Sequence, residues 1–452
     1  MKEEIESQTT HKVELRAIEV NELHDIYSYS LSNLVDDPAV FIHGKNGMGK
    51  TTVLNMIFGL ANGQFAIFDA VTFDSLIFDF GICGKDKDKS TGSFSWLERK
   101  LRIRKNVGTG KPEWDINSEN NFVDMPEGYY TKGSAADQVL QLSSIFKYLN
   151  RASCGRHWTI RGKGHYDDGE VLENLNHEIE KLITTQRESF GFLSDWNVAL
   201  VSSDRLTEGS SISKRKRDDI RENSGIFRAQ HILAKVLKSH VLDSKQTDRK
   251  YEQEFLNSLF TDSSSASDFD EKLLRSRLEK INKTEEKMER YGLFPEWSSL
   301  GIPTRSLNSE EKRLLDSYLN TAENKLEPHS GFLVDLALFE SLITSSLAKK
   351  EIRPHLETGL VVESSGNNLK LDQLSSGEQH LVIIATKLIF EVDSGSLVLI
   401  DEPELSMHLE WQRVFSSNLK KIGQEKKLKF ICATHAPTIV GDNLEQLRPI
   451  KA

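Results

Sequence analysis

Residues 1–122 carry the hydrophobic pattern of β-strands. Apolar and polar residues mostly alternate over residues 13–20 and 101–104, which is the period of a strand with one buried face. Residues 38–42 are instead continuously apolar, as in a parallel strand that is buried on both faces. The pattern predicts that this segment forms the N-terminal lobe of an α/β fold.

The middle of the chain, residues 123–349, is dominated by apolar residues at helical spacing. The highly charged stretch around Leu274, Leu278 and Ile281 also fits a coiled coil of at most about three heptads. One strand-like run, residues 196–201, is expected to return to the sheet of the N-terminal lobe. We predict a mainly helical insert, with helices at residues 226–242, 268–288, 309–326 and 332–349.

Residues 350–452 alternate between strand and helix patterns and form the predicted C-terminal lobe. Strands that alternate with helices form a parallel sheet covered by helices on both faces. The expected fold class is therefore α/β. The predicted strands are residues 360–363, 369–371, 396–400 and 429–433, and the predicted helices are residues 378–390 and 410–422.

Composition narrows the class of protein. The 452 residues contain 58 Lys and Arg against 68 Asp and Glu, a formal net charge of −10, which argues against coating nucleic acid through bulk charge. There is no apolar run long enough for a membrane span, and the polar N-terminus lacks the apolar core of a secretory signal. Cys83, Cys154 and Cys432 lie far apart, which excludes a disulfide framework and a cysteine-based zinc site. We expect a cytoplasmic protein with no membrane partner.

Residues 44–51, Gly-Lys-Asn-Gly-Met-Gly-Lys-Thr, match the phosphate-binding pattern G-x-x-x-x-G-K-[ST] in full. They follow the apolar strand at 38–42 and open an apolar helix at 52–60, which is the context that the pattern requires. The glycines let backbone N–H groups turn toward phosphate oxygens at a helix N-terminus. Lys50 would bridge the β- and γ-phosphates of ATP, and the Thr51 hydroxyl would ligate Mg²⁺. A chance glycine turn is the alternative.

Two carboxylates, Asp401 and Glu402, follow the apolar strand predicted at residues 396–400. Ligands of open parallel sheets bind at the carboxyl ends of the strands. Asp401 would hold Mg²⁺ through water, and Glu402 would orient the attacking water or accept its proton. Taken alone, the two residues could also be a solvated acidic pair at a strand end.

Two further motifs lie at element ends. Residues 375–378, Ser-Ser-Gly-Glu, open the helix predicted at 378–390, either as an N-cap with a capping box or as an anion site, and both can hold. His435 follows the strand predicted at 429–433. A single histidine there is more often a polar strand-end residue than a catalytic one, but two other strand ends already carry ligand groups.

Together these motifs resemble the ATPases of the ABC superfamily, in particular its SMC, RecF and OLD-like branch. The order is the same: a Walker A loop, an LSSGEQ signature at 374–379, a Walker B carboxylate pair and a switch histidine. Residues 400–412 resemble the IDEPExSLH-x-WQ block of small bacterial members, residues 405–408 the D-loop at the dimer interface, and residues 434–437 the THSP block. The resemblance implies an ABC-type ATPase head, a mixed P-loop sheet with helices on both faces, interrupted by the insert.

The resemblance also implies a site that two copies build together. Two heads pack head to tail with ATP between them, so that the signature of one faces the phosphate loop of the other. The catalytic residues would be Glu402, Lys50 and His435, while Thr51 and Asp401 would hold Mg²⁺. The nucleotide contacts would come from Gly44, Asn46, Gly47, Gly49, Lys50, Thr51 and Thr52 of one copy and Ser375, Ser376, Gly377 and Glu378 of the other.

The size of the insert shapes the expected function. Lys50 and Ser375 are 325 residues apart, which is farther than the resemblance implies for a transporter ATPase. The helical pattern of the insert is nevertheless too short and too often interrupted for the long coiled-coil arm of a chromosome-organising SMC protein. The chain ends 17 residues after His435, so we expect no Toprim nuclease domain. The chain then most resembles the sensor ATPases of anti-phage systems such as PARIS and Septu. Such an ATPase would form a higher oligomer, hold a separate effector nuclease inactive, and release it on meeting a phage-encoded trigger protein.

The main alternative is a RecF- or SMC-like repair ATPase that binds DNA. The basic run at residues 214–217 could contact DNA or an acidic protein, but acidic residues follow it directly, as in an ordinary solvated loop. A cytoplasmic ATPase subunit of a transporter is a third and weaker alternative.

Overall fold

The chain divides into two compact units, residues 1–203 with 393–452 and residues 204–392. The computed structural model describes residues 12–87, 94–116, 123–124, 149–152, 157–161, 163–175, 193, 196–202, 225–242, 270–293, 301–344, 347, 350–405, 407–441 and 443–450.

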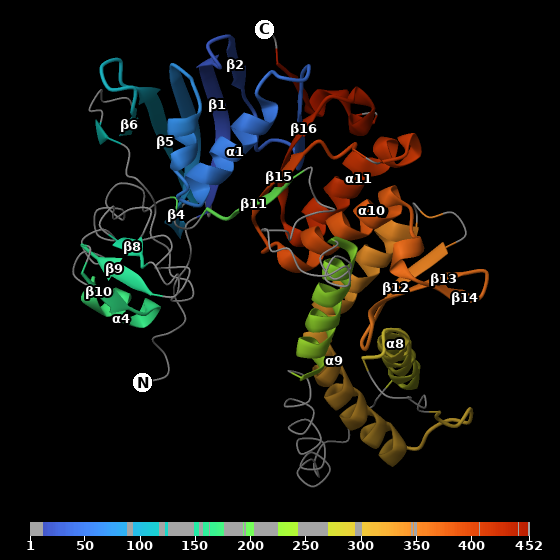
Figure 1. Ribbon diagram of the computed structural model, residues 1–452. Coiled ribbons are helices and arrows are strands. Elements are labelled where there is room, and N and C mark those ends of the chain that lie inside the picture. The colour runs from blue at the N-terminus through green and yellow to red at the C-terminus, as the bar shows by residue number, and fades with distance from the viewer. Residues whose placement is uncertain are drawn as a thin grey trace. The chain divides into compact units, whose positions relative to one another are not determined.

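The first unit is built on a five-stranded sheet in which every neighbouring pair is parallel. Its order is β11 (Val198–Val201), β15 (Leu397–Asp401), β16 (Lys429–Thr434), β3 (Ala39–His43) and β17 (Leu447–Pro449). Figure 1 labels β11, β15 and β16. The run predicted at 196–201 therefore returns to this sheet, as β11 beside β15. The predicted α/β fold class is confirmed.

Helices cover both faces of the parallel sheet. α1 (Lys50–Ala61) contacts β11, β15 and β16, and Ile431 of β16 shares its apolar core. α11 (Leu409–Lys426) packs on the other face, where a Cβ on Gly423 would lie 3.4 Å from the Phe430 ring. Successive strand residues point to opposite faces, so Phe430 and Ile431 face different helical layers.

An antiparallel sheet shares the core on the α1 side. Its order is β2 (Tyr27–Leu31), β1 (Val13–Leu23), β4 (Ser75–Lys87), β5 (Phe94–Lys105), β6 (Pro112–Ile116) and β7 (Val123–Asp124). The strands predicted at 13–20 and 101–104 are confirmed. Phe78 and Phe80 of β4 are fully buried in one cluster with α1. Parallel and antiparallel pairings thus lie in two sheets joined by one hydrophobic core.

Smaller elements complete the first unit. They are α2 (Ala66–Ala70), β8 (Leu149–Arg151), β9 (Trp158–Ile160), β10 (Lys163–Tyr166), α4 (Asp168–Asn174), η4 (Pro437–Val440) and η5 (Leu444–Gln446). β8, β9 and β10 form a sheet of their own, and Trp158 Nε1 donates a hydrogen bond to Asp168 of α4 (2.8 Å). Across the described parts of both units, no helix combines the length and apolar character of a membrane span.

The second unit contains the longest helices. Its elements are a helix at residues 225–242, α8 (Glu271–Arg290), α9 (Ser309–Thr344), β12 (Lys350–His355), β13 (Gly359–Ser364), β14 (Asn367–Leu369), η2 (Leu371–Gln373), α10 (Ser376–Thr386) and the π-helical turn η3 (Lys387–Glu391). β12, β13 and β14 form an antiparallel sheet. The helices predicted at 226–242, 268–288 and 378–390 are present with slightly shifted ends.

The separate helices predicted at 309–326 and 332–349 are a single helix, α9, which passes through Pro328. Proline lacks the N–H that a helix interior uses, so a break was the expected outcome. Leu319, Leu326 and Leu333 are nevertheless buried at seven-residue intervals on both sides of it. Burial of one continuous apolar stripe therefore outweighs the missing hydrogen bond.

α8 packs along α9, and the two helices run in the same direction. Arg277 of α8 pairs with Asp316 near the start of α9 (2.7 Å), whereas Arg290 at the end of α8 pairs with Glu340 near its end (3.4 Å). Two parallel helices need a connection that returns along the pair, and residues 301–308 are the described end of that connection.

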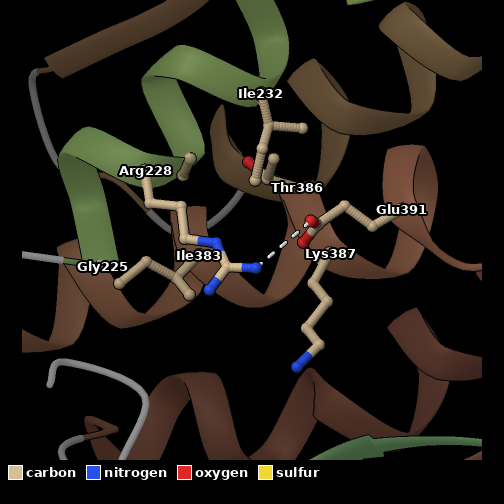
Figure 2. A pocket seen from close by; sticks show the side chains of 8 residues that line it. Gly225, Arg228, Ile232, Ile383, Thr386, Lys387 and Glu391 are labelled. Atoms are coloured by element: carbon tan, nitrogen blue, oxygen red, sulfur yellow. Dashed lines mark ion pairs between the residues drawn. The ribbon is translucent and has the colours of Figure 1, made fainter. Parts of the chain in front are cut away.

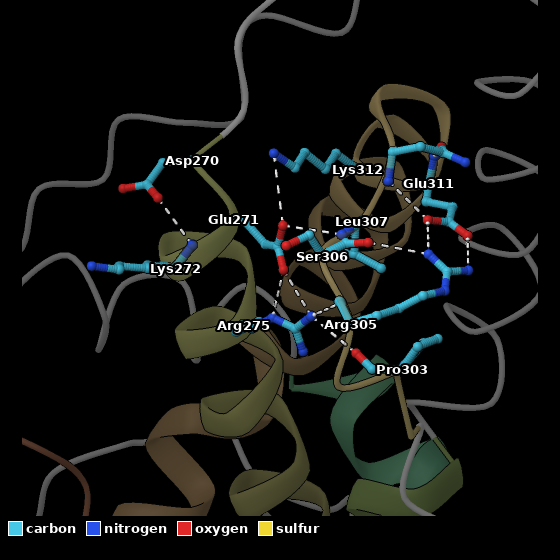
Figure 3. Close-up of polar contacts among 11 residues, drawn as sticks. Asp270, Glu271, Lys272, Arg275, Pro303, Arg305, Ser306, Leu307, Glu311 and Lys312 are labelled. Atoms are coloured by element: carbon cyan, nitrogen blue, oxygen red, sulfur yellow. Dashed lines mark hydrogen bonds and ion pairs between the residues drawn. The ribbon is translucent and has the colours of Figure 1, made fainter.

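The end of this connection is held by the first turns of α8 (Figure 3). Arg275 donates to the carbonyls of Pro303 (2.9 Å) and Arg305 (2.8 Å) and pairs with Glu271 (2.8 Å). Glu271 also accepts the N–H of Leu307 (3.1 Å). The hydrogen bonds from Arg275 and Leu307 hold the pKa of Glu271 below its ordinary value, so the carboxylate stays ionised and keeps the connection in place.

Candidate active site

The phosphate loop lies between β3 and α1. Gly47 and Gly49 have left-handed φ angles of 84° and 79°, which residues with a Cβ adopt only at a cost. A Cβ on Gly49 would lie 2.4 Å from Leu23 Cδ2, whereas one on Gly47 would meet nothing within 4 Å. The loop is thus tightly packed on one side and open on the other, as a phosphate cradle must be.

Lys50 is buried at the first position of α1. Its ammonium donates hydrogen bonds to the carbonyls of Gly44 (2.7 Å) and Lys45 (3.1 Å), which belong to the same loop. A positive charge beside the N-terminus of a helix makes this loop favourable for an anion.

The central contact of the site joins residues 350 positions apart in the chain. Thr51 Oγ1 lies 3.0 Å from both carboxylate oxygens of Asp401. Asp401 ends β15, is 5% exposed and stands opposite Ala433 of β16. Hydroxyl and carboxylate oxygens are the hard ligands that Mg²⁺ prefers. The two residues predicted as metal ligands are therefore adjacent.

Glu402 turns the chain out of β15 directly after Asp401. Its φ of 43° lies in the left-handed region, which is uncommon for a residue with a side chain and is concentrated at functional sites. Its N–H donates to the carbonyl of Ala433 (2.9 Å). The predicted water-orienting residue thus stands at the carboxyl end of the parallel sheet, next to the predicted metal ligand Asp401.

Glu404 is a site residue that the sequence motifs do not single out. It is 5% exposed, and its Oε1 accepts hydrogen bonds from Thr434 Oγ1 (2.7 Å) and from the N–H groups of His435 (2.7 Å) and Ala436 (3.2 Å). His435 Nδ1 lies 2.9 Å from the same oxygen. The only signal in the sequence is the acidic residue within the block at 400–412.

A second link joins the same two loops. Thr438 donates to Gln412 Oε1 (2.7 Å), and Gln412 Nε2 donates to the carbonyl of Met407 (3.2 Å). Gln412 is buried in the first turn of α11. The segment after β15 and the segment after β16 are therefore fastened at two points.

The turn between β1 and β2 also reaches the start of α1. His24 Nε2 lies 3.3 Å from Thr52 Oγ1, and Leu23 packs where a Cβ on Gly49 would stand. Thr52 is one of the predicted nucleotide contacts. No local pattern indicates His24, because its relation to the phosphate loop arises only when β1 joins the antiparallel sheet.

The signature residues belong to the second unit, at the N-terminus of α10. Ser375 is the N-cap, and it forms a capping box with Glu378, whose Oε2 accepts the Ser375 N–H (2.7 Å). Lys350 pairs with Glu378 (2.8 Å). Burial opposes ionisation of Glu378, but the hydrogen bonds from Lys350 and Ser375 outweigh it and lower its pKa. The predicted cap is confirmed, and Ser375 and Ser376 remain exposed.

The residues of the first unit fit ATP with Mg²⁺ by the chemistry of their donors. Lys50 and the N-terminus of α1 suit phosphate oxygens, and the Thr51–Asp401 pair offers hard oxygen ligands. Bound Mg²⁺ supplies charge neutralisation at the phosphates. Among the described residues, no group of three or more His, Cys, Asp or Glu is arranged as another metal site.

A small pocket lies in the second unit (Figure 2). It lies between the helix at 225–242 and the end of α10, and its walls include Arg228 and Glu391, which approach to 3.9 Å. No predicted site residue lines it. The basic run at 214–217, Cys154 and Ser406 of the predicted D-loop lie outside the described residues.

The fold and the site define a P-loop nucleotide hydrolase. The chain belongs to the AAA ATPase domain family, whose model matches residues 27–440, and the protein is therefore an ATPase, as predicted.

The chain is also similar to two solved structures of Smc heads. One is an Smc head domain with an extended coiled coil bound to the C-terminal domain of ScpA, derived from Pyrococcus furiosus, with 11% identity, a TM-score of 0.38, and 97% of this chain and 94% of that chain covered. The other is an Smc head bound to the C-winged helix domain of ScpA. It has 12% identity and a TM-score of 0.36, and the match covers 94% of this chain and 90% of that chain.

Proposed function

We propose that the protein is the ATP-binding and hydrolysing sensor of a bacterial anti-phage defence system, most like AriA of PARIS and next PtuA of Septu. It holds a separate effector nuclease and releases it when a phage-encoded trigger protein binds. The proposal rests on one observation: the phosphate loop and Asp401 lie in one compact unit, and the exposed serines of the signature lie in another. A phosphate loop and a signature helix that belong to different units suit a nucleotide that joins two copies of the chain.

In the proposed mechanism each copy supplies half of the site. Lys50 bridges the phosphates, Thr51 and Asp401 hold Mg²⁺, and Glu402 orients the attacking water. His435 contacts the γ-phosphate, and Ser375 and Ser376 of a second copy close the site with the N-terminus of their helix. ATP stabilises the joined state because it binds that state best. Hydrolysis removes this stabilisation, and the assembly loosens.

Co-expression of the tagged protein with the products of neighbouring open reading frames tests the proposal. We expect a nuclease of Toprim or HNH type to co-purify with the wild type. Lys50→Ala should lose it, because the nucleotide no longer joins the copies, and Glu402→Gln should retain it when the trigger is present. If retention is the same for the wild type and both variants, ATP does not control the partner and the proposal fails.

The alternative is a DNA-binding repair ATPase of the RecF or SMC type. On the described part of the antiparallel sheet, cations face carboxylates: Arg104 pairs with Glu113 (3.2 Å), and Arg102 lies opposite Asp115 across the strands. A surface on which each arginine is paired with a carboxylate does not favour binding of the phosphate backbone of DNA. DNA-stimulated ATP turnover, with DNA affinity that falls linearly with the logarithm of salt concentration, would favour the alternative instead.

A further inference from the structure

Glu404 lies on the loop after β15 that carries Glu402, and its buried carboxylate contacts the loop after β16 that carries His435. One of its oxygens, Oε1, gathers the Thr434 hydroxyl, two consecutive backbone N–H groups and His435 Nδ1, all within 3.2 Å. The side chain of His435 is 41% exposed, whereas that of Glu404 is 3% exposed. A buried anchor thus holds an exposed imidazole.

The contact at Nδ1 determines what the imidazole can offer to a ligand. A neutral histidine carries its proton on one ring nitrogen, and a carboxylate acceptor fixes that proton on the nitrogen it contacts. With Nδ1 committed to Glu404, Nε2 is the ring nitrogen left for a nucleotide. The carboxylate also fixes the orientation of the ring, as carboxylates do for histidines that ligate metals.

We propose that Glu404 is a positioning residue for ATP hydrolysis, acting through His435. Glu404 is buried; it holds the loop after β16 and presents Nε2 of His435 in one orientation. Because Glu404 is only two residues after Glu402, the same contact keeps the histidine in register with the water-orienting carboxylate. This inference rests on the proposed role of His435 at the γ-phosphate.

The link through Gln412 provides a matched control. Thr438→Val removes the hydrogen bond to Gln412 Oε1, so it weakens the fastening of the same two loops without touching Glu404 or His435. If loop fastening alone matters, Thr438→Val should impair hydrolysis as Glu404 variants do. If orientation of His435 matters, it should leave hydrolysis within about threefold of wild type.

A double-mutant cycle on the full-length protein tests the proposal. We measure kcat for ATP and the affinity for a fluorescent ATP analogue in Glu404→Ala, His435→Ala and the double variant. Each single variant should lower kcat by about 10- to 100-fold with the affinity changed less than about threefold. The double variant should be no more than about threefold slower than His435→Ala, because Glu404 has no effect without the histidine.

Three results would overturn the inference. If the losses multiply in the double variant, Glu404 acts independently of His435. If His435→Ala is slow but Glu404→Ala is not, the histidine needs no anchor, although its proposed role survives. If His435→Ala itself keeps full kcat, the proposed role of His435 fails and the inference with it. Should Glu404→Ala not fold, the cycle is repeated with Glu404→Gln, which keeps an acceptor oxygen and should show a smaller, equally non-additive loss.

Discussion

The loops at the end of the parallel sheet and the helix pair α8–α9 each bury a glutamate, but the two carboxyl groups differ in their hydrogen bonding. Glu404 is 5% exposed and Glu285 is 7% exposed. Glu404 Oε1 accepts hydrogen bonds from the loop after β16. Among the described residues, Oε2 has no hydrogen-bond partner in either glutamate. Burial raises the pKa of Glu285 to about 7, although the charge of Lys325 partly opposes this.

The difference separates a buried carboxyl group that organises a site from one that only costs stability. Hydrogen bonds to an ionised carboxylate offset its desolvation and fix the groups that donate them. A carboxylate without them is driven toward its neutral form. We therefore expect substitutions of buried ionisable residues in the sheet loops to change activity, and substitutions of such residues in the helix pair to change stability.

The largest effect is expected at Lys50. Lys50→Ala removes the buried ammonium of the phosphate loop, and ATP hydrolysis should fall by at least about 100-fold. Steady-state phosphate release measures this, and Glu285→Gln serves as the control with unchanged turnover. A Lys50→Ala protein that hydrolyses ATP at the wild-type rate would remove the phosphate loop from the mechanism.

Gly49→Ala should destabilise the first unit by about 2–4 kcal/mol, because it adds a left-handed residue and a 2.4 Å contact with Leu23. The matched variant Gly47→Ala has a similar φ but open space around it, and should cost about 1 kcal/mol. Urea unfolding compares the two. Equal losses would mean that packing against Leu23 contributes nothing.

Glu285→Gln should change how stability depends on pH. A carboxyl whose folded pKa is raised to about 7 from 4.5 holds its proton in the folded state after the unfolded chain has released it, so its contribution to stability is lost as pH rises between these values. The neutral glutamine removes this loss and should stabilise the protein by about 1–3 kcal/mol at pH 8 but little at pH 4. Denaturation at both pH values provides the measurement, and an equal change at the two would contradict the raised pKa.

The smallest effect is expected at the exposed pair of Lys283 and Glu279 on α8. The two side chains are each 68% exposed and separated by 2.7 Å, and exposed pairs of this kind contribute little because water screens them. Lys283→Ala should leave the thermal midpoint unchanged within error. A clear loss would show that charges on this helix matter more than its buried residues.

The sequence predicted those features that depend on neighbouring residues. The strands at β1, β3, β15 and β16, the phosphate loop and the cap at Ser375 follow from local patterns, and the structure contains them. The continuity of α9 through Pro328 does not follow from local patterns, because it depends on an apolar stripe that packs against α8.

The residues Glu404 and His24 were also beyond local patterns. Glu404 acquires its partners from a strand end about 30 residues later, and His24 meets α1 only after the antiparallel sheet has formed. The division of the chain at residues 203/204 and 392/393 likewise reflects long-range pairing of β11 with β15. The sequence indicated only that the run at residues 196–201 returns to the sheet, and its pattern placed the boundaries at 122/123 and 349/350.

The central claim is that ATP joins two copies, each of which supplies part of the site. Sedimentation of Glu402→Gln, which should bind ATP without hydrolysing it, tests this directly. With ATP and Mg²⁺ it should sediment as a larger species than without nucleotide, and the added substitution Ser376→Arg, at an exposed position next to the intact cap of α10, should prevent the change. The claim would be contradicted if the Glu402→Gln protein sedimented at the same mass with and without ATP, or if it assembled equally well with the added Ser376→Arg substitution.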